Sequence, residues 1–317
     1  MVLVYVLCVA VTSLFILIIC NIVIARPLHQ SSTPREKFKN NFARRKEIPR
    51  KIWTYWDEAE TPPFVQKCID TWRYHNPDFE INVLHRHNHE KFTGMDVYTL
   101  KLCEDNAVRS SDFIRLMVLE KYGGIWMDAS IVCFKPLSFF DTHLRSKDFI
   151  GFKIEKFVTD ERYPVIENWS FACVPKAKFV TRWLAECLKM HNFPSLDAFV
   201  DDLHQNKKVD LQNIEGPSYL ACHSAAQYVM QKIPDSYNMH CFNAAGDNPI
   251  FGKGPFYYIM NNGWDNVRGL EALCSDGKEE YTDSTFIKLR GAERIYLIAH
   301  EHLQKCVFDL AYRSRKE

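Results

Sequence analysis

The sequence predicts an α/β domain, and three consecutive segments near its beginning carry that prediction. Residues 52–56 read Ile-Trp-Thr-Tyr-Trp and are apolar enough for a buried strand. A Pro-Pro pair at 62–63 precedes an expected helix that ends at the Asn-Pro pair 76–77. Residues 79–84 alternate between apolar and polar side chains, as in a second strand. A strand, a helix and a strand in this order point to a Rossmann-like sheet.

Strand and helix signals continue along the rest of the chain, and no internal repeat is visible. Strands are expected at 149–154, at 169–174, near Tyr257 and at 286–289, and helices at 176–190, 195–203 and 218–231. Pro49 opens this region, and we expect a single domain over 49–317.

The N-terminal residues differ in character from this domain. The stretch from Val2 to Ala25 is almost wholly apolar and long enough to cross a bilayer, which predicts a transmembrane anchor over 1–25. A cleaved signal peptide is the alternative, but its apolar region would be shorter and would end in a small-residue cleavage site. The length favours an uncleaved signal-anchor. Residues 26–48 are polar and basic, and we expect them to form a stem.

The composition is that of a globular protein with a large core. Of the 317 residues, 47% are hydrophobic and 25% are charged. The formal net charge of +1 gives no electrostatic support to nucleic-acid binding, so no nucleic-acid partner is expected. The 11 cysteines show no zinc-type spacing. Buried free thiols are the favoured interpretation, and a disulfide or two in a lumen is the alternative.

Residues 109–130 form the most informative segment of the chain. They predict a helix that stops at a Gly-Gly pair and turns into a short apolar strand. Asp112 and Arg115 are three residues apart and therefore share one face of that helix. The strand ends on Asp128. Because ligands of open α/β sheets bind just outside the carboxyl ends of strands, Asp128 is a candidate ligand-binding residue.

Four short motifs along the chain carry a resemblance to a known family. They are K-I-W-T-Y-W at 51–56, C-x-x-x-W at 68–72 with N-P-D at 76–78, S-D-F-I-R-L…Y-G-G-I-W-M-D-A-S over 111–130, and N-W-S-F-A at 168–172. This series resembles the capsular polysaccharide synthesis glycosyltransferases, which belong with the wider DXD-containing sugar transferases. The resemblance covers most of 49 to about 305. It implies a GT-A fold, a nucleotide-diphosphate-sugar donor, and transfer with retention of the anomeric configuration.

The resemblance also implies roles for individual residues. Asp112 and Arg115 match residues that sit near the nucleotide and sugar of the donor, and Asp128 matches the first Asp of the DXD motif. These three are the expected catalytic residues. Arg109, at the start of the same segment, is a further candidate for donor binding.

Aromatic and amide side chains are candidates for the remaining contacts. Trp53 and Tyr55 are expected to stack on the nucleotide base or on a sugar face, with packing in the core as the alternative. Asn168 and Trp169 are expected on the acceptor side.

A divalent metal ion, Mn²⁺ or Mg²⁺, is the expected cofactor. Asp128 is followed by Ala129 and Ser130, so the second carboxylate of the DXD motif is missing. These ions prefer hard oxygen ligands, so the Ser130 hydroxyl and the donor diphosphate are expected to complete the coordination, helped by His300 or His302. The alternatives are that Ser130 caps a turn and that the histidines begin a C-terminal helix.

The sequence therefore predicts a metal-dependent, membrane-anchored glycosyltransferase that transfers a hexosyl group to a glycan or glycoconjugate acceptor. A catalytically silent glycan-binding or scaffold protein of the same fold is the main alternative. A sugar-phosphate transferase and a tethered interaction module are weaker alternatives.

The predicted localisation is a membrane crossed once, which in a eukaryote would be the Golgi or the ER membrane. Lysines and arginines follow the apolar span and none precedes it, so the positive-inside rule places the domain in the cytoplasm. A Golgi-type enzyme would have the opposite orientation. The sequence leaves this orientation open.

Overall fold

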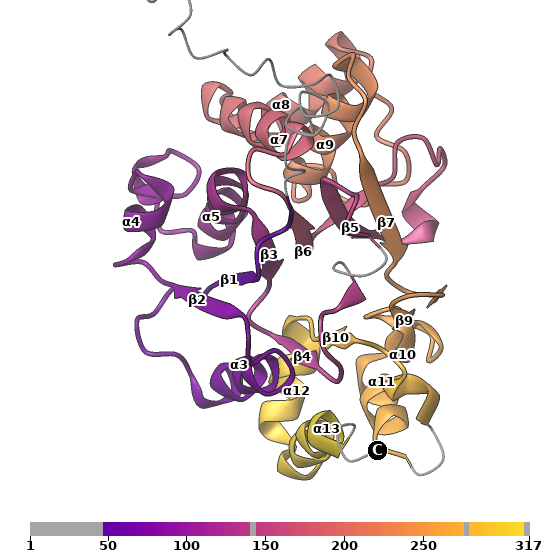
Figure 1. Ribbon diagram of the computed structural model, residues 1–317. Helices are drawn as coiled ribbons and strands as arrows, with labels where there is room; N and C mark the ends of the chain where they lie inside the picture. Colours follow the sequence, from indigo (N-terminus) through magenta and orange to yellow (C-terminus); the bar gives the residue numbers. More distant parts are fainter. Residues whose placement is uncertain (1–46, 140–143, 276–278, 314–317) are drawn as a thin grey trace, which may run out of the picture. The chain divides into compact units, whose positions relative to one another are not determined.

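The computed structural model describes residues 47–139, 144–275 and 279–313. Their central element is a mixed β-sheet in the order β2-β1-β3-β6-β5-β7 (Figure 1). Its strands are β1 (Lys51–Tyr55), β2 (Glu80–Leu84), β3 (Gly124–Met127), β5 (Phe149–Lys153), β6 (Ile166–Cys173) and β7 (Met239–Asn243). Short antiparallel pairs are formed by β4 (Ile131–Cys133) with β10 (Phe286–Lys288), and by β8 (Asp247–Asn248) with β9 (Gly252–Lys253).

Parallel pairs predominate in the central sheet. β1 is parallel to β2 and to β3, and β5 is parallel to β7, whereas β6 is antiparallel to both β3 and β5. The first two strands enclose helix α3 (Pro63–His75), which is the strand–helix–strand unit predicted from the sequence. The predicted α/β class is thus confirmed, and the finer GT-A assignment remains a prediction.

The other helices are α4 (His89–Thr93), α5 (Ala107–Tyr122), α7 (Lys178–Leu188), α8 (Leu196–Asp201), α9 (Ala221–Lys232), α10 (Tyr257–Met260), α11 (Asn266–Leu273), α12 (Gly291–Ala299) and α13 (Glu301–Arg313). Helices α5, α7, α8 and α9 lie where the sequence predicted helices, and the described segments contain further helices that it did not predict. Single helical turns lie at η1 (Val97–Thr99), η2 (Glu155–Phe157), η3 (Lys189–Asn192), η4 (Asp202–Asn206) and η5 (Glu279–Thr282). The strand predicted near Tyr257 is wrong: Met260 N–H donates to Phe256 O over 2.9 Å, which closes a helical turn there.

Helix α5 and the glycines after it position the end of β3. The Asn106 side chain caps the helix by accepting a hydrogen bond from Arg109 N–H. Gly123 and Gly124 have φ of +65° and +103°, in the region that L side chains rarely adopt. A Cβ on Gly124 would lie 2.5 Å from the Lys51 carbonyl oxygen. The pair therefore allows α5 to end and turn into β3, as the sequence predicted, and it also allows β3 to lie against β1.

The helices form two groups on either side of the sheet. Helices α7, α8 and α9 lie together near β5 and β6, and α3, α12 and α13 lie on the opposite side (Figure 1). Two apolar cores correspond to these groups: one surrounds the sheet with α5, α7 and α9, and the other joins α3, β4 and β10 to the C-terminal helices. The strand pair β4–β10 thus brings the C-terminal region beside the turn that follows β3.

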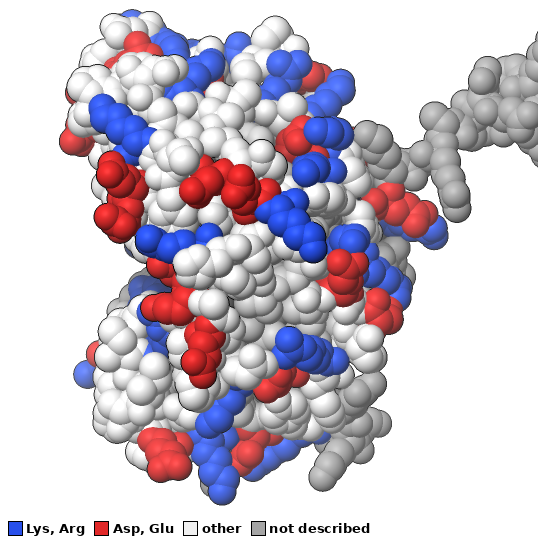
Figure 2. Space-filling model, turned by 90° about the vertical axis from the view of Figure 1, so that its left-hand side faces the viewer, with Lys and Arg blue, Asp and Glu red and all other residues white. Residues whose placement is uncertain are grey.

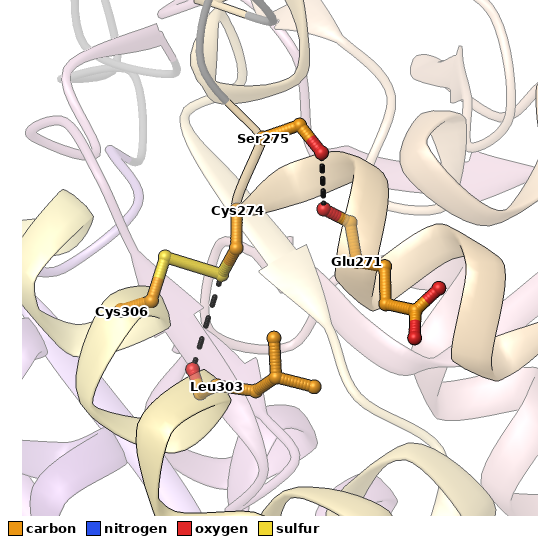
Figure 3. The surroundings of a disulfide bond; sticks show 5 residues. All are labelled: Glu271, Cys274, Ser275, Leu303 and Cys306. Atoms are coloured by element: carbon orange, nitrogen blue, oxygen red, sulfur yellow. Dashed lines mark hydrogen bonds between the residues drawn. A yellow bond between two sulfur atoms is a disulfide. The ribbon is translucent and has the colours of Figure 1, made fainter.

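A disulfide between Cys274 and Cys306 ties the end of α11 to α13 (Figure 3). The other cysteines of the described segments are free: Cys68, Cys103, Cys133, Cys173, Cys187, Cys222 and Cys241. All of these are buried except Cys241, which is half-buried. The favoured interpretation, buried free thiols, thus holds for most of these cysteines, and one pair forms a disulfide.

The predicted anchor and nearly all of the predicted stem lie outside the described residues. No helix within the segments that the structure describes is long and apolar enough to cross a membrane. On the face shown in Figure 2, acidic and basic side chains are interspersed, so neither sign of charge dominates that face.

Candidate active site

Helix α5 and strand β3 bring the three expected catalytic residues into one cluster. Asp112 and Arg115 lie one turn apart on α5, and Asp128 follows the last residue of β3. Arg115 Nη1 lies 3.5 Å from Asp112 Oδ1, and Arg115 Nη2 lies 3.5 Å from Asp128 Oδ1. The guanidinium of Arg115 therefore stands between the two carboxylates and links the helix to the strand end.

Asp112 is buried and accepts hydrogen bonds through both carboxylate oxygens. Arg109 Nη1 donates to Oδ2 over 2.9 Å, and Asn168 Nδ2 donates to Oδ1 over 3.0 Å. Burial raises the pKa of Asp112 above its usual value, although Arg115 and Arg109 act in the opposite direction. Asp112 holds two guanidinium groups and an amide in fixed positions around it.

Asp128 is the more accessible of the two carboxylates, with 25% of its side chain exposed. Trp126 Nε1 donates to Oδ1 over 2.9 Å, and the Lys288 ammonium lies 3.0 Å from Oδ2. Burial alone would raise the pKa of Asp128, but the charges of Lys288 and Arg115 outweigh it and hold the pKa below the usual value. Asp128 is therefore an ionised carboxylate whose two oxygens both have partners.

A cavity of about 140 Å³ opens beside these residues. Its lining includes five residues predicted from the sequence: Arg109, Asp112, Arg115, Asp128 and Asn168. The opposite wall comes from four residues just before and at the start of α9: Tyr219, Leu220, Cys222 and His223. The cavity thus presents two guanidinium groups and two carboxylates to whatever enters it.

His223 belongs to that opposite wall and was not predicted from the sequence. Its side chain is buried, and its Nδ1 has no hydrogen-bond partner among the described residues. Burial, with the nearby charges of Arg115 and Arg109, lowers the pKa of His223 to about 3. At neutral pH the cavity therefore contains an uncharged imidazole, with one ring nitrogen to donate and one to accept.

Two of the predicted donor contacts lie away from this cavity. Trp53 is buried in the core, where it stacks on Tyr122 with ring centroids 5.3 Å apart and donates from Nε1 to Gly123 O over 3.0 Å. The Tyr55 hydroxyl donates to Asp57 Oδ1 over 2.5 Å. Burial, followed by the hydrogen bond to Asp57, raises the pKa of Tyr55 well above its usual value. These placements support core packing for Trp53 and a polar contact at the end of β1 for Tyr55.

The two residues expected on the acceptor side occupy different surroundings. Asn168 lines the cavity, and its carbonyl oxygen accepts a hydrogen bond of 2.7 Å from Arg115 Nη1. Trp169 is buried against Phe152, with ring centroids 5.0 Å apart, and donates from Nε1 to Glu167 Oε2 over 2.8 Å. Asn168 is therefore placed to meet a ligand, whereas the Trp169 ring contributes to the core.

Comparison with known families supplies an independent observation. The model of the capsular polysaccharide synthesis protein family matches residues 23–193, which is more than half of the chain. The chain belongs to this family.

Relatives of this family member were found among curated proteins and among solved structures. It is 27% identical over 152 residues to O-glycosyltransferase braB of Annulohypoxylon truncatum, a match that covers 43% of this chain and 36% of that protein. The chain thus spans only about a third of the length of this curated relative.

The solved structures are more distant. Galactosyltransferase LgtC, in complex with donor and acceptor sugar analogues, shares 10% identity at a TM-score of 0.40, covering 82% of this chain and 95% of LgtC. The PaToxG glycosyltransferase shares 15% identity at a TM-score of 0.35, covering 60% of this chain and 79% of PaToxG.

The residues expected to hold a divalent metal ion do not fit that role as they are arranged. The Ser130 hydroxyl donates to Leu289 O over 2.6 Å and accepts from Lys288 Nζ over 3.0 Å. His300 Nδ1 is 2.9 Å from Tyr296 O and its ring stacks on the Tyr296 ring. Among the residues that the structure describes, no three His, Cys, Asp or Glu side chains are grouped so that they could hold a metal ion. An ammonium group, rather than a further oxygen ligand, faces Asp128 and Ser130.

Lys288 and His223 are the two residues of the cluster that sequence reasoning missed. Lys288 interrupts the apolar run Phe286–Leu289. Because a lysine in a buried strand requires a charged or polar partner, this interruption was a sequence signal for a buried ion pair. His223 follows an Ala-Cys pair in an amphipathic helix and offers no comparable signal.

Proposed function

We propose that this family member is a glycosyltransferase that moves a sugar from a nucleotide-diphosphate donor to a glycan or glycoconjugate acceptor. The observation that carries the proposal is the cavity at the end of β3, where Arg109 and Arg115 stand beside Asp112 and Asp128. Family membership and the name of the curated relative agree with it.

The charges in and around the cavity suit a diphosphate leaving group. Arg109, Arg115 and Lys288 carry three positive charges, and Asp112 and Asp128 carry at most two negative charges. The excess is positive, and guanidinium groups match the geometry of phosphate oxygens. Fixed cations that face the departing diphosphate would stabilise the charge that develops as the glycosidic bond to phosphate breaks.

The size of the cavity suits the sugar rather than the whole donor. Its volume of about 140 Å³ is below the roughly 300–1,000 Å³ of pockets that enclose drug-sized ligands. One sugar unit would occupy the cavity, with Asn168 and His223 as hydrogen-bonding partners for its hydroxyl groups.

Retention of configuration is part of the proposal. An inverting transfer needs a base that removes the acceptor proton opposite the leaving group. Asp112 and Asp128 are each engaged by arginine or lysine, and burial lowers the pKa of His223 to about 3, so none of these three cavity residues suits that role.

We also propose that the domain lies on the oxidising side of a membrane, held by the anchor predicted over 1–25. The Cys274–Cys306 disulfide supports this orientation, because disulfides persist in lumenal and extracellular compartments and are rare in the cytosol. A cytoplasmic domain with both thiols reduced in cells would contradict it.

The function is tested with the full chain in detergent and a panel of nucleotide sugars, following release of the nucleoside diphosphate. Release from one or a few donors, increased by a glycan acceptor, is the expected result. The anomeric configuration of the product, determined by NMR, tests retention. Binding of glycans without release of nucleotide from any donor would instead identify a silent glycan-binding protein.

A further inference from the structure

Strand β10 delivers Lys288 to the turn after β3. Lys288 pairs with Ile131 in the β4–β10 register, and Leu289 N–H donates to Ser130 O over 3.2 Å. The backbone of Lys288 is held on its other side, because its N–H donates to Pro255 O over 3.2 Å and its carbonyl accepts from the Tyr258 hydroxyl over 3.1 Å. The base of this side chain is therefore fixed.

The ammonium group of Lys288 contacts both polar residues of the Asp-Ala-Ser turn. Nζ lies 3.0 Å from Asp128 Oδ2 and donates to Ser130 Oγ over 3.0 Å. A lysine ammonium has three hydrogens to donate. Within the described part of the chain Nζ has these two partners, and 10% of the Lys288 side chain is exposed, beside the Asp128 carboxylate that lines the cavity.

The charges of this turn balance in the same way as those of a two-carboxylate metal site. Two carboxylates and a divalent cation sum to zero, and one carboxylate and one ammonium also sum to zero. The hydroxyl of Ser130 stands where the second carboxylate is missing, and Lys288 supplies a single positive charge at that place. The net charge of the turn is therefore the same when one carboxylate is missing and a lysine takes the place of the divalent ion.

We propose that the Lys288 ammonium is a built-in cation at Asp128 that contacts the leaving diphosphate, in the role that a divalent ion has at a two-carboxylate turn. This inference rests on the proposed function. In the transfer, the bond between the anomeric carbon and the phosphate oxygen breaks, and both electrons stay on the diphosphate. The acceptor oxygen bonds to the same carbon, and its proton leaves on the diphosphate. Lys288 transfers no proton in this step and stabilises the charge of the leaving group.

Two measurements on the full chain in detergent test the inference: donor turnover, and calorimetric binding of UDP and GDP. Both are made after exhaustive EDTA treatment and again with added Mn²⁺. We expect turnover and nucleotide binding to change by less than about threefold between these conditions. Loss of turnover in EDTA with recovery in Mn²⁺ would overturn the inference while leaving the proposed function intact. If the protein shows no turnover and no nucleotide binding in either condition, the proposed function is overturned, and the inference falls with it.

Variants separate the charge of Lys288 from its structural contribution. Lys288→Met keeps most of the side-chain volume and should lower turnover by about 100-fold, in the range for loss of one fixed donor at a developing charge. Lys288→Arg keeps the charge and should retain more activity than Lys288→Met. Lys178→Met, which removes an exposed lysine paired with Asp235, is the matched control and should behave as the wild type.

A double variant tests whether the ammonium replaces a metal ion, because a lysine with a purely structural role would not make activity depend on Mn²⁺. Ser130→Asp combined with Lys288→Met creates two carboxylates without the ammonium. It should be inactive in EDTA and regain activity with Mn²⁺, because carboxylates are hard ligands for this ion. Full activity of Lys288→Met in EDTA, with an unchanged melting temperature, would overturn the inference.

Discussion

The guanidinium of Arg115 donates a hydrogen bond of 2.7 Å to the backbone carbonyl oxygen of Asn168. This contact joins α5 to β6. The same guanidinium lies over the Trp126 ring, 5.2 Å from its centroid. One planar group therefore connects the helix, two strands and both carboxylates of the cavity.

Arg115→Lys should not be a conservative change. A lysine is a point charge and cannot reproduce the separate contacts of a planar fork. We expect the KM for the donor to rise by about tenfold or more, measured by release of nucleoside diphosphate. If neither KM nor kcat changes, Arg115 serves only as part of an ion-pair network.

Asp128→Asn should leave the fold intact and lower turnover by about 100-fold or more. The change removes the negative charge that holds Lys288 and Arg115 at the end of β3. Circular dichroism checks the fold, and steady-state kinetics measure turnover. Asp283→Asn, at an exposed aspartate paired with Lys135, is the control that should retain activity. Normal turnover in a folded Asp128→Asn variant would contradict the assignment.

His223→Phe should weaken donor binding without lowering stability. The substitution removes a buried nitrogen that has no partner in the described segments, so the melting temperature should stay the same or rise. The KM for the donor should rise by about tenfold, because a hydrogen-bonding partner of the sugar is lost.

The matched control for this change is His191→Phe. His191 also has a buried, unpartnered ring nitrogen among the described residues, but it packs on Phe113 and does not line the cavity. An equal rise in KM for both variants would show that the effect is not specific to the cavity.

Glu167 should make stability depend on pH. Burial raises the pKa of Glu167 from 4.5 to about 7, although the Trp169 hydrogen bond and nearby lysines oppose it. The folded protein thus binds this proton more tightly than the unfolded chain does. The contribution of Glu167 to stability is therefore full below about pH 4.5 and is lost as pH rises through about 7.

Glu167→Gln isolates that contribution from all other titrating groups. The difference in unfolding free energy between the wild type and the variant should fall between pH 4.5 and 7 and level off above it. Denaturant titrations at pH 4.5, 6 and 8 measure it. A difference that is constant with pH would mean that Glu167 ionises at its usual value.

Much of the cavity could be predicted because its signals are local. The turn of helix that separates Asp112 from Arg115, the glycines after α5 and the position of Asp128 all follow from neighbouring residues. Lys288 reaches the same place only through pairing of β10 with β4. Such long-range pairing leaves no local pattern that identifies the partner.

The errors of prediction have similar causes. The segment at Tyr257 is short and aromatic, and such segments suit either a strand or a buried helical turn. The apolar run at β1 predicted a buried strand, but not which of its aromatic side chains would be covered. The direction of β6 is also set by its connections rather than by its own residues.

Replacing Cys274 and Cys306 by serine should lower the free energy of unfolding by about 2–4 kcal/mol, the usual range for a disulfide. The bond joins residues 32 positions apart and so restricts the unfolded chain. Cys241→Ser, at a free half-buried cysteine, is the control. Equal denaturation midpoints for the oxidised protein and the double variant would contradict this expectation.

The same disulfide encloses β10, since Phe286–Lys288 lies between Cys274 and Cys306 in the chain. The stretch that carries the ammonium group to Asp128 is thus a closed covalent ring. Reduction would open this ring and loosen the register on which the ammonium depends. The proposed transferase activity should therefore be lower in the reduced protein than in the oxidised protein.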